Sequence, residues 1–189
     1  MKIIVQKYGG KLVADVSKIR QVAHKIADTY QQGNAVVVVV SAMGDMTNQL
    51  EKQVLLCSQH PNRREKDAVL AVGEQITIGM LSITLQEMGY RAISFTGWQA
   101  GIQTDSHYHD ANILRIQTNK IQEKLQDGYI VIVAGFQGVD AKENITTLGR
   151  RWFGYNSGMF SSCPAGRSMR NLQGYQMHLY SGSQTDSTS

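Results

Sequence analysis

Apolar runs recur along the first three quarters of the chain. Ala35–Val40 reads A-V-V-V-V-V, and Tyr129–Ala134 reads Y-I-V-I-V-A. Runs without a polar face are typical of strands that are buried on both sides of a parallel sheet. Shorter strand-type runs cover Ile3–Val5 and Arg91–Phe95. The sequence therefore predicts a sheet whose central strands are fully buried.

Helix-type periodicity separates these apolar runs. In Val16–Tyr30 the apolar residues Ile19, Val22, Ala23 and Ile26 fall on one face of a helix. We also expect a long helix over Asp67–Met88 and a helical stretch over Lys120–Gln126. Gly89 marks the end of the second helix. The alternation of strands and helices predicts an α/β fold, a three-layer sandwich with a mainly parallel central sheet. Such sheets bind ligands at the carboxyl ends of their strands.

The composition is that of an ordinary globular domain. The chain has 189 residues, 42% hydrophobic and 18% charged, and a net charge of +4 from scattered Lys and Arg. A scattered charge argues against nucleic-acid binding, and no apolar run reaches the roughly 20 residues of a membrane span. Cys57 and Cys163 lack metal or redox spacing, which favours reduced thiols. We expect a cytoplasmic protein that binds neither nucleic acid nor membrane.

The first strand-type run ends in a sequence suited to phosphate. Lys7 is followed by Tyr8 and the pair Gly9-Gly10. Glycines let backbone N–H groups approach anionic oxygens, and a lysine supplies a compact positive charge. The Walker pattern and the G-x-G-x-x-G dinucleotide pattern are both absent, so this loop belongs to a different nucleotide-binding fold.

Three of the predicted strands run into polar, glycine-rich segments. S-A-M-G-D-M-T-N follows Val40, T-G-W-Q-A-G-I follows Phe95, and G-F-Q-G follows Ala134. Each segment alone reads as a turn, but the carboxyl ends of parallel strands lie at one edge of a sheet. We therefore expect these segments to form one binding edge.

Few charged side chains stand out from the pattern. Glu74 lies in a mostly apolar helical stretch, where it is either a surface residue or a buried carboxylate in need of a partner such as a bound ammonium group. The run from Arg63 to Asp67 has mixed signs, and we expect it to cap and solvate the start of a helix. His107 and His109 have a spacing that suits a metal, but no third ligand is nearby in the sequence.

Six motifs stand in a fixed order: K-Y-G-G at 7–10, V-V-V-S-A-M-G-D-M-T-N at 38–48, V-G-E-Q at 72–75, T-G-W-Q-A-G-I at 96–102, V-A-G-F-Q-G at 133–138 and I-T-T-L-G-R at 145–150. Together they resemble the kinase domain of aspartate kinase, of the monofunctional bacterial type. The resemblance covers residues 1–150 and implies the amino-acid kinase fold, incomplete at its C-terminal side. Residues 151–189 lie outside it.

The resemblance implies an activity and its cofactors. Aspartate kinases transfer the γ-phosphoryl group of ATP to the side-chain carboxylate of L-aspartate. The product, 4-phospho-L-aspartate, is the entry to lysine, threonine and methionine synthesis. ATP would bind with Mg²⁺ between its phosphates, and no protein residue is implied as a metal ligand. In the full-length family, the resemblance also implies a homo-oligomer or a regulatory subunit.

The resemblance also assigns roles to single residues. The ATP phosphates would lie against Lys7, Tyr8, Gly9, Gly10 and Ser41. Lys7 would be the catalytic residue, because it offsets charge that develops on the transferred group. L-aspartate would be held by Thr47, Glu74 and Arg150, with Glu74 on its ammonium group and Arg150 on a carboxylate.

The chain departs from the family pattern at two places. Lys11 and Leu12 replace the Thr and Ser that usually follow K-F-G-G, and after Arg150 the family's G-G-S-D-T-T-A-V is replaced by R-W-F-G-Y-N-S-G. The tail 151–189 is rich in Ser and Gly, and we expect it to be poorly ordered.

A shifted reading frame explains the tail. Codons that encode residues 151–158 can be chosen so that reading them one nucleotide later gives G-G-S-D-T-T-A, the family's own continuation. Trp152 has a single codon, so the codons that give this match cannot all be chosen freely. We hypothesise a one-base shift near Arg150. The coding DNA decides the point, since the hypothesis fails if no frame continues as an aspartate kinase.

Two other functions remain open from the sequence. A related kinase that acts on acetylglutamate or carbamate would share the fold but should lack T-G-W-Q-A-G-I. A fragment without turnover could still bind aspartate or a partner subunit. Because the second half of the kinase pattern is missing, we expect the chain as given to be inactive.

Overall fold

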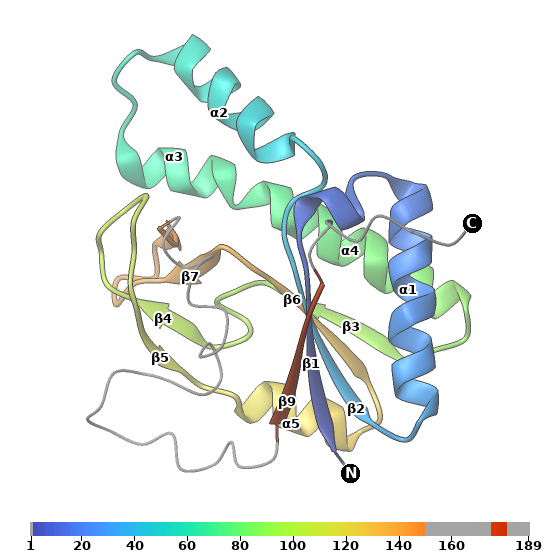
Figure 1. Cartoon of the computed structure of the whole chain (residues 1–189). Helices are drawn as coiled ribbons and strands as arrows, with labels where there is room; N and C mark the ends of the chain where they lie inside the picture. The colour runs from blue at the N-terminus through green and yellow to red at the C-terminus, as the bar shows by residue number, and fades with distance from the viewer. Residues whose placement is uncertain (1, 150–174, 181–189) are drawn as a thin grey trace.

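A five-stranded parallel sheet forms the centre of the molecule (Figure 1). The computed structural model describes residues 2–149 and 175–180. The strand order is β3-β6-β2-β1-β9, and every neighbouring pair is parallel. The strands are β1 (Ile3–Tyr8), β2 (Ala35–Val40), β3 (Ala92–Phe95), β6 (Ile130–Ala134) and β9 (Tyr175–Tyr180). Every residue of β2 and β6 is buried, as their uniformly apolar sequences predict.

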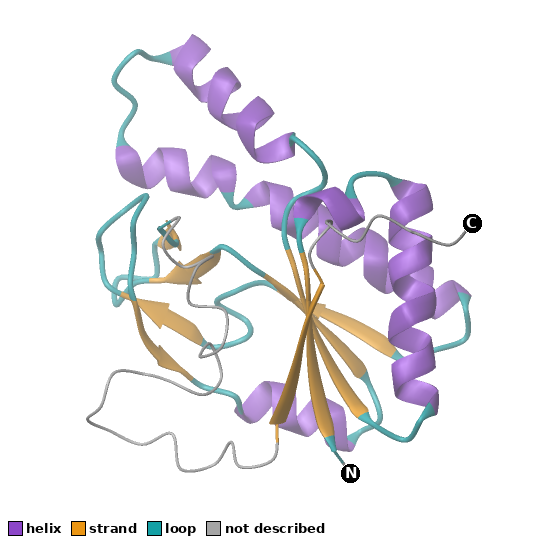
Figure 2. Cartoon of the chain, viewed as in Figure 1, coloured by secondary structure: helices purple, strands orange, loops and turns teal. Residues whose placement is uncertain are grey.

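Both faces of this sheet are covered (Figure 2). Helices α1 (Val16–Gln31) and α4 (Val72–Glu87) pack on one face, and their apolar side chains form a core with alternate residues of the strands. Helix α5 (Asn119–Gln126) and a second, smaller sheet pack on the other face. The structure therefore confirms the predicted α/β fold with a mainly parallel sheet.

The smaller sheet has four short strands in the order β5-β4-β7-β8. They are β4 (Ile102–Thr104), β5 (Ile113–Ile116), β7 (Gln137–Val139) and β8 (Ile145–Thr147). Strands β7 and β8 form an antiparallel hairpin, and Gln137 pairs with Thr147. The sequence analysis did not predict this sheet.

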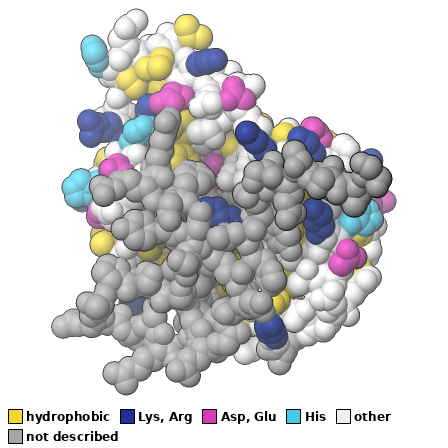
Figure 3. All heavy atoms as spheres, in the orientation of Figure 1, with side chains coloured by type: hydrophobic (Ala, Val, Ile, Leu, Met, Phe, Trp, Pro, Cys, Tyr) yellow, Lys and Arg dark blue, Asp and Glu magenta, His cyan; other side chains and the backbone are white. Residues whose placement is uncertain are grey.

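Two more helices project beside the main sheet at the top of Figure 1. They are α2 (Met46–Cys57) and α3 (Arg63–Leu70). Helix α3 leads through Ala71 directly into α4, so the predicted single helix Asp67–Met88 is in fact two helical segments. Leu55 and Leu56 of α2 are exposed, and hydrophobic side chains gather in this region of Figure 3.

The helical run Arg63–Glu87 is long and largely apolar. By length and composition it is apolar enough to cross a membrane, although the sequence contains no uninterrupted apolar run of that length. Half of its most apolar window is buried inside the protein, as in the core helix of a globular domain.

One strand of the tail is described. The sequence analysis expects the tail to be poorly ordered, and within the described residues 175–180 the strand β9 pairs with β1 over the full length of both strands. Its sequence, Y-Q-M-H-L-Y, alternates apolar and polar residues, a strand pattern that the composition of the whole tail conceals. The rest of the tail and the proposed frame shift lie outside the described residues.

Candidate functional site

The loop after β1 lies against the loop after β2. The Gly44 N–H donates to the Gly10 carbonyl at 3.1 Å, and the Ser41 N–H donates to the Tyr8 carbonyl at 3.1 Å. A Cβ at Gly10 would stand 2.8 Å from the Ala42 carbonyl oxygen, whereas nothing lies within 4 Å of a Cβ at Gly9. Gly10 therefore permits the close approach of the two loops, and Gly9 borders open space.

Lys7 is partly buried at the carboxyl end of β1. Burial lowers the pKa of its ammonium group below the usual value of 10.5, because the charged form loses solvation. Tyr8 is 1% exposed, and its hydroxyl donates to Gln6 Oε1 at 3.2 Å. Tyr8 therefore contributes to this loop through its backbone, while its ring belongs to the core.

Glu74 lies in the first turn of α4 and is 2% exposed. Its Oε1 accepts a hydrogen bond from the Ala42 N–H at 3.0 Å. Its Oε2 is buried and has no hydrogen-bond partner among the described residues. Burial raises the pKa of this carboxyl to about 7, and the Ala42 N–H partly opposes the shift. Of the two readings that the sequence left open, the structure selects the buried carboxylate.

The segment after β2 links the glycine loop to Glu74. Its Ala42 contacts Glu74, and its Gly44 contacts Gly10. Thr47 lies in the first turn of α2 and is partly buried, so the expected open loop ends in a helix at Met46. In the sequence, Ser41 and Thr47 stand on either side of Ala42, the residue that contacts Glu74. Arg150 lies outside the described residues.

The other two strand-end segments meet at Gln137. Its Oε1 accepts from the Gly97 N–H at 3.4 Å, and its Nε2 donates to the Ala71 carbonyl at 2.8 Å. The Gly135 N–H donates to the Val40 carbonyl at 2.9 Å. The structure thus confirms that the three segments converge at one edge of the sheet.

Asp67 is a residue whose environment the sequence analysis misjudged. We expected it in a solvated charge run, but it is 0% exposed. Its carboxylate accepts hydrogen bonds from the backbone of His109 and from Thr147. These partners are 42 and 80 residues away in the sequence, so no local pattern could reveal them.

The histidines do not form part of a metal cluster within the part of the chain that the structure describes. There, no group of three or more His, Cys, Asp or Glu side chains could hold a metal ion. The His107 Nδ1 instead lies 3.1 Å from Asp105 Oδ2.

Comparison with known proteins identifies the family to which this fold and its motifs belong. A profile described as "Amino acid kinase family" matches residues 2–157. The chain belongs to this family. Within this family, the chain is 52% identical over 150 residues to the aspartokinase of Bacillus sp. (strain MGA3). The aligned region covers 79% of this chain and 36% of that protein. The chain is also 50% identical over 150 residues to aspartokinase 2 of Bacillus subtilis (strain 168). That aligned region covers 79% of this chain and 37% of the relative.

Solved structures of aspartate kinases have a fold similar to that of this chain. The aspartate kinase from Synechocystis matches with a TM-score of 0.66 and 43% identity, over 78% of this chain and 24% of that chain. E. coli aspartokinase III in complex with aspartate and ADP has the same fold at 20% identity, with a TM-score of 0.66, over 79% of this chain and 44% of that chain. The resemblance to aspartate kinases is therefore confirmed for the N-terminal part of this chain. The chain spans about one third of the length of the curated relatives it matches.

Proposed function

We propose that the chain is the N-terminal part of an aspartate kinase, which transfers the γ-phosphoryl group of ATP to the side-chain carboxylate of L-aspartate. The proposal rests on the Oε2 of Glu74, which is buried and has no hydrogen-bond partner among the residues that the structure describes. A buried carboxylate oxygen without a partner is costly, and the ammonium group of an amino acid would satisfy it. The aspartokinase relatives and the pairing of aspartate with ADP in the E. coli enzyme support this ligand.

The glycine loop is the proposed phosphate site. Gly9 borders open space, Gly10 brings the backbone against the segment that carries Ser41, and Lys7 adds a positive charge at the strand end. A carboxylate nucleophile needs no general base, so catalysis would rest on positioning and on stabilising charge in the transition state. Lys7 would supply that charge.

Thr47 and Arg150 are proposed to complete the aspartate site. Thr47 follows the Ala42 contact with Glu74 by five positions along the same segment, and its hydroxyl could bond a substrate carboxylate. Arg150 would hold a carboxylate through its planar guanidinium group.

Mg²⁺ is proposed as a companion of ATP rather than a protein-bound ion. The described residues offer no cluster of acidic or histidine ligands, so its ligands would come from the nucleotide phosphates. ATP use would place the enzyme in the cytoplasm.

A non-catalytic fragment is the second candidate. The chain matches only about a third of its relatives, and an aspartate site built on Glu74 can bind without the remaining part. A kinase for acetylglutamate is disfavoured, because an acetylated amine carries no ammonium group for Glu74.

Calorimetric titration of the full chain with L-aspartate tests the proposed ligand. We expect binding that Glu74→Gln weakens at least tenfold, because a charged hydrogen bond is lost. Glu87→Gln on the exposed end of the same helix is the matched control and should bind like the parent chain. N-acetyl-L-glutamate should give no heat. Equal binding of the parent and Glu74→Gln would rule out the proposed role.

A further inference from the structure

Gln137 is a fully buried polar side chain to which the proposed function assigns no role. It is the first residue of β7 and is 0% exposed. Its Nε2 donates to the Ala71 carbonyl at 2.8 Å, and its Oε1 accepts from the Gly97 N–H at 3.4 Å. A buried amide group without hydrogen-bond partners is costly, so these two contacts determine how the side chain is oriented.

The main chain around Gln137 is also closely packed. A Cβ at Gly97 would collide with the Gln137 carbonyl oxygen, so the segment after β3 can approach β7 this closely only with a glycine at that position. Gln137 also pairs with Thr147 in the β7–β8 hairpin. Two neighbouring segments therefore hold the backbone from which the Gln137 side chain extends.

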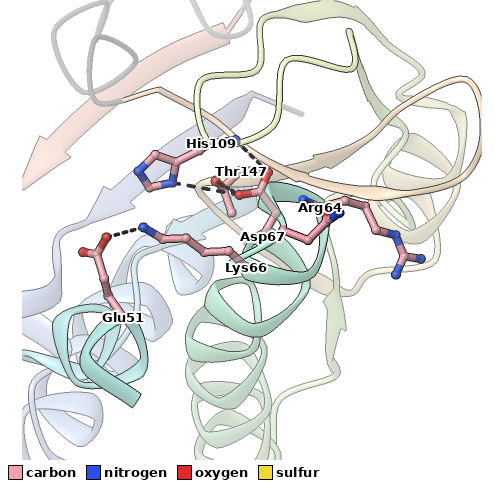
Figure 4. A network of polar contacts seen from close by, with 7 residues as sticks. Glu51, Arg64, Lys66, Asp67, His109 and Thr147 are labelled. Atoms are coloured by element: carbon pink, nitrogen blue, oxygen red, sulfur yellow. Dashed lines mark hydrogen bonds and ion pairs between the residues drawn. The ribbon is translucent and has the colours of Figure 1, made fainter. Parts of the chain in front are cut away.

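The β7–β8 hairpin contacts the helices at two points that are one helical turn apart. Figure 4 shows the Asp67 side chain of α3 turned toward Thr147, whose N–H and hydroxyl both donate to the carboxylate at 2.8 Å. Asp67 and Ala71 are four residues apart, a spacing that places them on one helical face. The two facing residues of one hairpin pair, Thr147 and Gln137, thus bond to one turn of the helical run.

Ala71 is the junction between α3 and α4. It follows the last residue of α3 and precedes the first residue of α4. Glu74 comes three positions later, in the first turn of α4. Because the backbone of one helical turn moves nearly as a unit, the contact that places the Ala71 carbonyl also places the backbone of Glu74.

The first turn of α4 also packs against the segment after β2. Glu74 Oε1 accepts from the Ala42 N–H at 3.0 Å, and a Cβ at Gly73 would stand 2.8 Å from the Ala42 Cβ. The start of α4 is therefore held between its contacts with Ala42 and with Gln137. A shift of this turn away from Ala42 would weaken the Glu74 hydrogen bond and admit water to the buried carboxyl.

We propose that Gln137 is a positioning residue for Glu74. Its amide group holds the start of α4 so that the Glu74 carboxylate lies beside Ala42, ready to receive the ammonium group of L-aspartate. Displacements of about 1 Å in such a site are costly to binding. This inference rests on the proposed function, because it names what sets the geometry of that same site.

A titration of Glu74 followed by carbon NMR tests the inference without a ligand. In the parent chain, the side-chain carboxyl carbon of Glu74, assigned by its loss in Glu74→Gln, should titrate at its raised pKa of about 7. Gln137→Met keeps a side chain of similar length but removes both hydrogen bonds. We expect the pKa of Glu74 to fall toward the ordinary 4.5, because water reaches the carboxyl. A merely structural role of Gln137 would leave this pKa unchanged in the folded molecules.

Calorimetry of the full chain with L-aspartate measures the consequence for the ligand. Gln137→Met should raise the dissociation constant by about tenfold or more, with an unchanged number of sites. A loss of folded molecules alone would instead lower the number of sites and leave the dissociation constant unchanged.

Thr146→Val is the matched control. Thr146 lies on β8 of the same hairpin and is 0% exposed, and its hydroxyl bonds the Thr104 hydroxyl of β4 at 2.6 Å. Valine has nearly the same shape, so this variant removes a buried hydrogen bond that joins strands of the smaller sheet and leaves the Ala71 contact in place. The pKa of Glu74 should stay near 7, and the aspartate dissociation constant should stay within twofold of the parent value.

A second variant covers the case in which Gln137→Met does not fold. Gln137→Asn keeps an amide group that is one methylene too short to reach both partners, and it should raise the dissociation constant severalfold while lowering the pKa of Glu74. A folded variant whose Glu74 pKa or aspartate affinity matches the parent overturns the inference, as does an equal effect in Thr146→Val. If the parent chain binds no L-aspartate, the proposed function fails, and the titration of Glu74 in Gln137→Met still decides whether Gln137 positions it.

Discussion

Asp67 of α3 and Glu74 of α4 are both buried carboxylates, but their surroundings differ. Both oxygens of Asp67 accept hydrogen bonds, whereas Oε2 of Glu74 has no partner in the described structure. An unsatisfied buried oxygen is destabilising on its own, and the burial that removes water from this carboxyl also raises its pKa. The contrast separates a residue that holds the fold together from one that is suited to a ligand.

The raised pKa of Glu74 predicts a pH-dependent stability. The folded-state pKa of about 7 lies above the ordinary 4.5, so the folded chain binds the proton more tightly than the unfolded chain. The stabilising contribution is complete below pH 4.5 and is lost as the pH rises through 7. It amounts to on the order of 3 kcal/mol.

Urea unfolding at pH 5 and pH 8 measures this contribution. Glu74→Gln should reduce the difference in free energy of unfolding between the two pH values, while Glu87→Gln should not. An identical pH dependence in Glu74→Gln and the parent chain would show that Glu74 does not titrate in this range.

Lys7 gives a prediction for catalysis. In a chain continued in the restored reading frame, Lys7→Ala should lower turnover on the order of 10²-fold or more, the scale for losing a group that stabilises transition-state charge. Lys11→Ala is the control, because Lys11 is exposed in the short 3-10 helix Gly10–Val13, and the turnover of this variant should stay near that of the parent. Unchanged turnover in Lys7→Ala would assign this function to another residue.

At the scale of elements, the sequence predicts the long helices and the uniformly apolar strands. Ala35–Val40 matches β2 without error, and Val16–Tyr30 differs from α1 by one residue. The smaller sheet is missed because strands of three or four residues are too short to show a period. The partners of Asp67 are missed because burial of a charge depends on residues distant in sequence.

Two glycines of α4 test the contact between that helix and the segment after β2. A Cβ at Gly73 would stand 2.8 Å from the Ala42 Cβ, whereas nothing lies within 4 Å of a Cβ at Gly79. Gly73→Ala should lower the free energy of unfolding by about 1–3 kcal/mol through overpacking. Gly79→Ala should raise it by about 0.5–1 kcal/mol through helix propensity. Urea unfolding measures both, and equal effects would contradict the described packing.

At the scale of the molecule, the chain contains the edge that we propose to bind aspartate, and it spans about a third of the length of its relatives. Its sheet is covered on both faces, and β9 pairs with β1 at one edge. The regions that would complete an aspartate kinase lie beyond the matched 150 residues. Binding and turnover should therefore be separable in this chain.

The stability and solubility of the 189-residue chain can also be predicted. We expect the 189-residue chain to be marginally stable and prone to aggregate, because it exposes the large apolar side chains of Leu55 and Leu56 on α2. Static light scattering should show association at concentrations where a frame-restored chain stays monodisperse. Equal solubility of the two chains would contradict this expectation.

Formation of aspartyl phosphate, trapped with hydroxylamine, tests the central claim most directly. The assay compares the 189-residue chain with a chain whose coding sequence is read one base later after Arg150. We predict little or no product from the first, and a turnover on the order of 1–100 per second from the second. Turnover at that rate by the 189-residue chain, or none by the frame-restored chain, would contradict the account.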